Sequence, residues 1–169
     1  TVSEAGPNFP DNISFSSVRA SSKCSKIRTP LPAARPSAFK TKGGCKVSKN
    51  AQGKLKIDKV IAVMDCGWYV NPDIIRAQVE GSVVMAHGAA VVHATNFKDG
   101  KAVETNFHQY RMTRMSDIPE IEVHIMENEE KPGGVGEPGL PPFAPALCNA
   151  IFDLTGKRIR KLPFSMNEV

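Results

Sequence analysis

The segment GGVGEPGLPPFAPALC, residues 133–148, places one carboxylate, Glu137, among glycines and prolines. Glycines allow backbone N–H groups to approach an anion closely, and a helix expected after them would add its positive end. Such a loop could bind a phosphate, a dithiolene or an oxometal group, with Glu137 beside it as a general base. Because glycine-rich loops are common, a structural role in which Glu137 only caps the helix stays open.

A second polar group of interest is Gln78, which lies in the apolar segment 73–93. Gln78 and Glu80 are the polar exceptions in the first two turns of a helix that is otherwise apolar on nearly all faces. Such a helix is expected to be buried by its neighbours, and buried polar groups need hydrogen-bond partners. Gln78 is therefore predicted to contact a ligand or a backbone group.

The histidines and cysteines show none of the spacings that are typical of metal sites. The four histidines (87, 93, 108 and 124) have no i,i+3 or i,i+4 relation to one another or to a cysteine. The four cysteines (24, 45, 66 and 148) form no CxxC pair, which the usual zinc and iron–sulfur sites require. We expect no metal-ligating residues, and we interpret Cys66 and Cys148 as small buried apolar residues.

The elements that would position Gln78 come from the first half of the chain. Residues 46–67 predict two strands joined by a glycine turn, the second a continuous apolar run. Asn71 is a natural N-cap and Pro72 suits the first helical position, so a helix is predicted from 73 to about 93.

The second half of the chain supplies the elements around Glu137. Asp99-Gly100 predicts the turn of a hairpin within 95–107, and the alternation in 120–126 predicts a strand. A helix is expected over 141–156, and 157–164 is predicted to form a short basic strand. The fold class is therefore α+β, a mixed sheet with two buried helices.

The first 45 residues differ from the rest of the chain in composition. They hold seven Lys or Arg against two acidic residues, which accounts for the whole net charge of +5. They are rich in Ser and Pro and show no helix or strand period, so 1–45 is predicted to be a disordered basic tail and 46–169 a domain. We favour a solvated tail over a polyanion-binding one, and expect no nucleic-acid partner.

No membrane span is predicted. The longest apolar run without a charge is 81–97, which is short for a span and contains His87, His93 and Asn96. The first ten residues have no basic start and no apolar run, so no signal peptide is expected there.

Three long segments together resemble one known protein family. They are VMDCGWYVNPDIIRAQVEGSVV (63–84), NFHQYRMTRMSDIPEIEVHI (106–125) and GGVGEPGLPPFAPALCNAIFDLTGKRIRKLP (133–163). In this order they resemble the C-terminal part of the molybdopterin-binding large subunit of the xanthine dehydrogenase/aldehyde oxidase family. The branch they are most similar to is the isoquinoline 1-oxidoreductase beta subunit. The likeness covers about residues 46–165.

The resemblance implies a role for each candidate residue. Glu137 falls on the family's active-site glutamate, the base that takes a proton from a molybdenum-bound hydroxyl. Gly134, Val135 and Gly136 match backbone that wraps the molybdenum–molybdopterin cofactor, expected in its cytosine dinucleotide form, and Gln78 matches a glutamine that contacts the pterin. The implied reaction hydroxylates an N-heteroaromatic or aldehyde carbon with oxygen derived from water.

The resemblance also implies partners. These are the remainder of the large subunit, a small 2Fe–2S subunit and a small-molecule substrate, in the cytoplasm or the periplasm. The chain would then be a fragment of a molybdenum hydroxylase that is not active alone. Two alternatives stay open: a truncated, non-catalytic remnant of such an enzyme, and a small basic module that binds polyanions through residues 1–45. The remnant predicts exposed apolar surface on the 74–92 helix, and the module predicts salt-sensitive binding.

Overall fold

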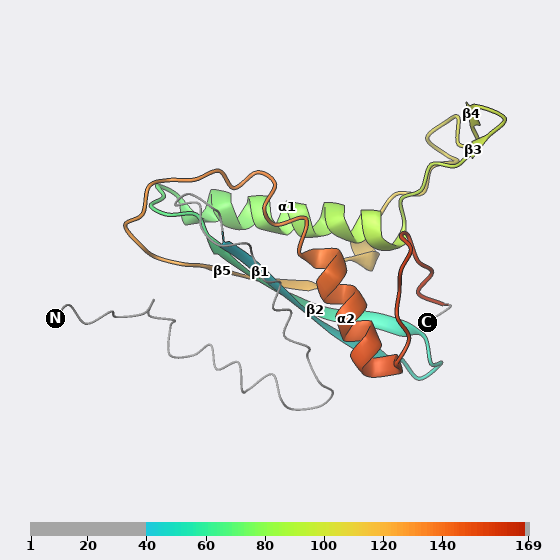
Figure 1. The fold of residues 1–169 in the computed structure, drawn as a ribbon, viewed down its shortest axis with the longest axis horizontal. Coiled ribbons are helices and arrows are strands. Elements are labelled where there is room, and N and C mark those ends of the chain that lie inside the picture. Colours follow the sequence, from blue (N-terminus) through green and yellow to red (C-terminus); the bar gives the residue numbers. More distant parts are fainter. Residues whose placement is uncertain (1–39, 168–169) are drawn as a thin grey trace.

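A computed structural model describes residues 40–167 of the chain (Figure 1). The predicted tail therefore lies outside the described residues up to position 39. Its last six residues, 40–45, belong to strand β1 (Lys40–Lys49), so the strand begins six residues before the predicted domain boundary. The lysines and glycines of 40–44 carry no strand pattern, and pairing with the neighbouring strand makes them extended.

Three strands form one mixed sheet, as predicted. β2 (Leu55–Asp65) lies between β1 and β5 (Glu120–Ile125). β1 pairs with β2 in antiparallel fashion through a tight turn, whereas β5 runs parallel to β2. A parallel neighbour requires a long crossover connection, and helix α1 lies in that connection.

Both helices begin and end close to the predicted positions. In α1 (Pro72–Val91) the side chain of Asn71 accepts a hydrogen bond from the Asp73 N–H, as expected of an N-cap. α2 (Phe143–Thr155) ends at Gly156, which adopts the left-handed conformation with φ of 75°. The neighbours predicted to bury α1 cover one side of it. Ile74 is 65% and Met85 59% exposed on the rest, which is the exposed apolar surface that the remnant alternative predicts for this helix.

The predicted hairpin is present, and the predicted basic strand is not. β3 (Phe97–Lys98) and β4 (Lys101–Ala102) pair across Asp99-Gly100, at the tip of an arm, residues 92–114, that projects from the body (Figure 1). Residues 157–164 form no strand, because this segment passes back along the end of α1 instead of a sheet edge. The N–H of its last residue, Phe164, donates to the Ala90 carbonyl at 3.0 Å.

The core has two parts, and the second supports the candidate site. In the first, Leu147 and Ile151 of α2 pack with α1 over the β1–β2 face. In the second, Met64, Ile75 and Val79 form a smaller cluster at the N-terminal half of α1. Cys66 is buried in this cluster as predicted, and burial raises the pKa of its thiol. Cys148 is only partly buried, and burial also raises its pKa.

His87 is a polar exception in the first part of the core. It is 4% exposed, its ring meets Phe143 edge-on, and within residues 40–167 its Nδ1 has no hydrogen-bond partner. Burial lowers the pKa of His87, Asp117 opposes this shift, and His93 adds to it.

Stability should therefore depend on pH through His87. Below about pH 6.5 the unfolded chain gains a proton at this residue while the folded chain stays neutral. The free energy of unfolding should fall as the pH drops, by at most about 1.4 kcal/mol per pH unit for one group. Urea unfolding between pH 7 and 5 measures this slope, and His87→Leu should reduce it. The exposed His108 serves as the control, since a similar reduction in His108→Gln would contradict the assignment.

Candidate active site

The Glu137 loop, defined as residues 126–142, connects β5 to α2 (Figure 1). Its first half lies beside the chain segment that leaves β2. Backbone hydrogen bonds attach its first half to the chain that leaves β2. Met126 N–H donates to Met64 O at 2.8 Å, Trp68 N–H to Glu130 O at 2.9 Å, and Gly133 N–H to Cys66 O at 2.9 Å. The loop therefore starts from a fixed position at the end of the sheet.

Two side-chain contacts also hold the Glu137 loop against the rest of the domain. The Asn128 amide donates to the Asp65 carboxylate at 2.7 Å, which joins the loop to the last residue of β2. Val135 is partly buried against the cluster of Met64, Ile75 and Val79. No sequence pattern indicates the contact between Asn128 and Asp65, since the two residues are far apart in the chain and of common types.

Gln78 and the Glu137 loop meet in the structure. The Gln78 Nε2 donates to the Gly136 carbonyl at 3.3 Å, across 58 residues of sequence. This is the backbone contact predicted for Gln78, although the side chain is exposed and not buried. The hydrogen bond places the carboxamide of Gln78 beside the residue that precedes Glu137.

Glu137 is exposed at the surface of the loop. Its carbonyl accepts the Leu140 N–H at 3.0 Å, which closes a turn around Pro138 and Gly139. The interpretation in which Glu137 only caps the helix is wrong, because α2 begins at Phe143 with Pro142 as N-cap and no side-chain cap bond. Two successive prolines set the start of this helix, so a distant carboxylate is not needed there.

The available groups could hold a ligand through backbone hydrogen bonds and one carboxamide. Gly133, Gly134 and Gly136 are exposed and have no side chains, so the loop presents backbone groups next to the Gln78 carboxamide. The nearest atom to a Cβ built on Gly136 is the Gln78 Nε2, at 4.0 Å. Neutral hydrogen-bonding groups of this kind can surround a ligand without adding charge. Within residues 40–167, no three His, Cys, Asp or Glu side chains are grouped to hold a metal ion.

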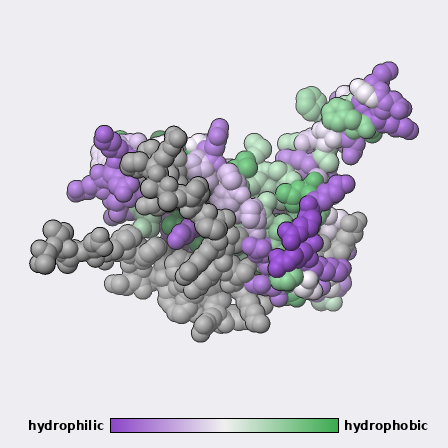
Figure 2. All heavy atoms as spheres, in the orientation of Figure 1, coloured by the Kyte–Doolittle hydropathy of each residue, from purple (hydrophilic) through white to green (hydrophobic). Residues whose placement is uncertain are grey.

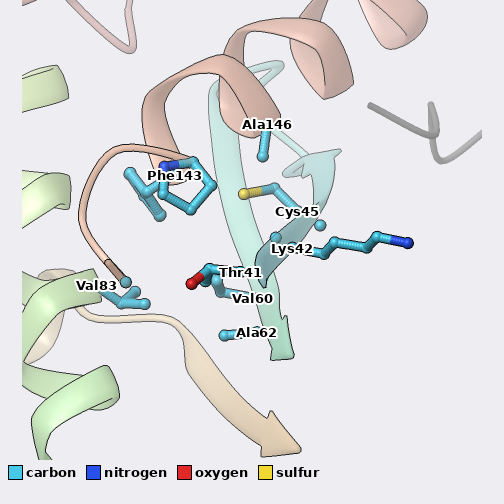
Figure 3. Close-up of a pocket in the computed structure, with 12 residues that line it drawn as sticks. Thr41, Lys42, Cys45, Val60, Ala62, Val83, Phe143 and Ala146 are labelled. Atoms are coloured by element: carbon cyan, nitrogen blue, oxygen red, sulfur yellow. The ribbon is translucent and has the colours of Figure 1, made fainter. Parts of the chain in front are cut away.

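The hollow shown in Figure 3 lies beneath the C-terminal end of the Glu137 loop, whose Gly139 and Pro142 help to line it, and it is too small to hold a cofactor. It lies within the first part of the core, between β1 and the start of α2, and Cys45, Val60 and Phe143 are among the residues that line it. It has room for about one water molecule and its walls are apolar. The candidate site is therefore an open surface formed by the Glu137 loop and α1.

Comparison with known proteins identifies the family. The model of the molybdopterin cofactor-binding domain matches residues 44–119, which include Gln78. The isoquinoline 1-oxidoreductase subunit beta of Brevundimonas diminuta is 34% identical over 113 residues, 67% of this chain and 14% of that protein. The chain belongs to the molybdopterin-binding subunits of the xanthine dehydrogenase/aldehyde oxidase family.

Further relatives agree with this assignment in sequence and in fold. The molybdenum-binding subunit of an Escherichia coli K12 aldehyde oxidoreductase is 30% identical over 128 residues, 71% of this chain and 18% of that protein. The fold matches quinoline 2-oxidoreductase from Pseudomonas putida 86 with a TM-score of 0.62 and 23% identity, over 69% of this chain and 16% of that one. The α+β fold is thus that of a molybdopterin-binding domain, and the chain spans less than a fifth of these relatives.

Proposed function

We propose that this chain supplies the catalytic base and part of the cofactor site of a molybdenum hydroxylase. The reaction would hydroxylate an N-heteroaromatic or aldehyde carbon with oxygen derived from water. The observation that carries the proposal is the Gln78–Gly136 hydrogen bond, since it joins two separate parts of the chain directly beside Glu137. Membership of the family supports the choice of cofactor.

The chain's own groups would divide the work between binding and proton transfer. Gln78 and the backbone of Gly134, Val135 and Gly136 would hold the molybdenum–molybdopterin cofactor, in its cytosine dinucleotide form. When bound, the molybdenum centre supplies the acceptor for two electrons and the water-derived oxygen. The exposed Glu137 carboxylate would accept the proton that this oxygen loses, with its backbone held by the turn to Leu140.

Exposed apolar side chains support the inference that other protein chains or domains bind this one. Trp68, Val70 and Ile74, near the start of α1, are 58%, 83% and 65% exposed. Phe107, in the arm, and Met115, where the chain returns from it, are 93% and 90% exposed, and Figure 2 shows hydrophobic side chains along this arm. Groups of exposed large apolar side chains such as these two can mark interaction sites. We infer that the remainder of the large subunit covers it and that a small 2Fe–2S subunit accepts the electrons.

Within the described residues, no helix has the length and apolar character needed to cross a bilayer.

Elemental analysis of molybdenum tests the proposal. The full chain is purified alone and after co-expression with the rest of a related molybdopterin-binding subunit. We expect molybdenum and pterin near one per chain in the assembled protein only, and product labelled with ¹⁸O from labelled water. An assembly that forms but holds no molybdenum would overturn the proposal. Failure to assemble at all would favour the non-catalytic remnant.

Replacing Gln78 with alanine should weaken cofactor retention with little effect on stability. The Gln78–Gly136 bond is exposed to competing water, so its loss should change stability little. Loss of one hydrogen bond from Gln78 to the cofactor, worth about 0.5–1.5 kcal/mol net, should weaken retention by about 2- to 10-fold. Molybdenum content during dialysis against a chelator measures retention, and thermal unfolding measures stability. Gln52→Ala, an exposed glutamine in the β1–β2 turn, is the matched control. Equal retention in the two variants would contradict the binding role.

A further inference from the structure

The Glu137 loop touches α1 at a second point, where Gly139 meets Ser82. Gly139 is buried, and a Cβ built on it would lie 2.9 Å from Ser82 Cβ, 3.2 Å from Ser82 Oγ and 3.6 Å from Val79 Cα. The first distance is shorter than real Cβ contacts allow, so any side chain here would have to displace the loop or the helix. The loop backbone therefore lies directly on the helix surface.

Ser82 is itself fixed in the helix. It is 7% exposed, and its Oγ donates to the Gln78 carbonyl at 2.8 Å. Residues four apart in a helix lie on the same face, so Gln78 and Ser82 form two successive contact points along α1. Gln78 contacts Gly136 and Ser82 contacts Gly139, so the two contacts lie on either side of Glu137.

We propose that the Ser82–Gly139 contact is the positioning device for Glu137. Between the two contact points the loop contains only Glu137 and Pro138, and proline has a restricted φ. The Gln78 contact is an exposed hydrogen bond for which water competes, whereas the Ser82–Gly139 contact is buried and steric. The buried contact therefore fixes where the carboxylate is held relative to α1. Its catalytic consequence rests on the function proposed above, but its structural consequence does not.

Hydrogen exchange and NMR on the full chain with Gly139→Ala test the contact directly. The Leu140 N–H, which bonds to Glu137 O, should exchange about tenfold faster, because the added methyl group displaces the loop. The side-chain amide resonance of Gln78 should move toward that of free glutamine. The Val103 N–H in the arm, which bonds to Asn96 O, should not change.

A second substitution supplies the rescue. Ser82→Gly in the same chain removes both close atoms, and the next nearest, Val79 Cα, is at an ordinary 3.6 Å, so the native Leu140 exchange and Gln78 resonance should return. Gly81→Ala is the matched control, because a Cβ there meets nothing within 4 Å. Unchanged signals in Gly139→Ala, or a double variant that does not recover them, would overturn the proposal. If Gly139→Ala does not fold, the double variant must still fold with a native Gln78 resonance.

Activity of the assembled, molybdenum-loaded enzyme separates this inference from the proposed function. Gly139→Ala should lower turnover per bound molybdenum, and Ser82→Gly should restore it. If the loop signals move and recover while Glu137→Gln stays active, the positioning contact stands and the proposed function fails. If Glu137→Gln is inactive while Gly139→Ala leaves the loop signals unchanged, the positioning contact fails and the proposed function stands.

Discussion

Replacing Glu137 with glutamine is expected to lower turnover of the assembled, molybdenum-loaded enzyme by about 100- to 10,000-fold, the usual contribution of a positioned general base. Glutamine keeps the size and the hydrogen-bonding capacity of the side chain but cannot accept a proton. The carboxylate is exposed on the loop and makes no cap bond to α2, so folding should be little affected. Loss of activity would thus report on proton transfer and not on structure.

Steady-state turnover and molybdenum content, measured on the same preparation, check this expectation. The matched control is Glu129→Gln, which removes another exposed carboxylate from the same loop and should retain activity. Equal molybdenum in the two variants ensures that the comparison concerns the reaction and not cofactor loading. A Glu137→Gln enzyme with more than about a tenth of normal turnover would contradict the role of general base.

Local sequence signals predicted most of the elements, because each rests on short-range chemistry. Asn71 and Pro72 begin α1, and Gly156 ends α2, through groups that lie within a few residues of the helix ends. The hairpin turn at Asp99-Gly100 is likewise local, with positive φ at both residues. Such signals remain informative when the rest of the fold is unknown.

The errors concern features that depend on tertiary contacts. β1 extends back to Lys40 because its partner strand β2 continues to Asp65, and no pattern in 40–45 reports this pairing. Exposed apolar surface on the 74–92 helix is expected only of the remnant alternative, and the apolar composition alone does not indicate that Ile74 and Met85 lie on the uncovered side. Residues 157–164 are predicted to form a short basic strand, but Phe164 is buried in the core and its N–H donates to the Ala90 carbonyl at the end of α1.

In the candidate site, too, the residues could be predicted from local signals, but their contacts could not. The glycine and proline pattern indicated Glu137, and the apolar helix indicated Gln78, each from its own segment. That the two segments touch is a consequence of the β2–α1–β5 crossover, which returns the chain parallel to β2 and carries the loop past α1. The close approaches at Gly67 and Gly139 could not be predicted, because a glycine in the sequence does not reveal what lies beside it.

Gly67→Ala is expected to cost about 2–5 kcal/mol of the free energy of unfolding, a large share of the stability of a small domain. Gly67 has φ of +72°, where alanine is strained by about 1–2 kcal/mol. A Cβ at this position would also overlap the backbone carbonyl oxygens of Lys131 and Glu130, the latter at 2.8 Å. Carbonyl groups of the backbone cannot rotate away as a side chain can. The cost of overpacking therefore adds to the conformational strain.

The matched control for this prediction is Gly53→Ala. Gly53 has a similar φ of +76°, but a Cβ there meets nothing within 4 Å, so it should show the conformational cost alone, about 1–2 kcal/mol. Urea unfolding of both variants isolates the close approach as the difference between them. Equal costs would mean that the loop is not held against Gly67. A larger cost at Gly67 would mean that the first half of the Glu137 loop is held by backbone contact, as we infer for its second half at Gly139. Glu137 would then project from a segment that is held at both ends.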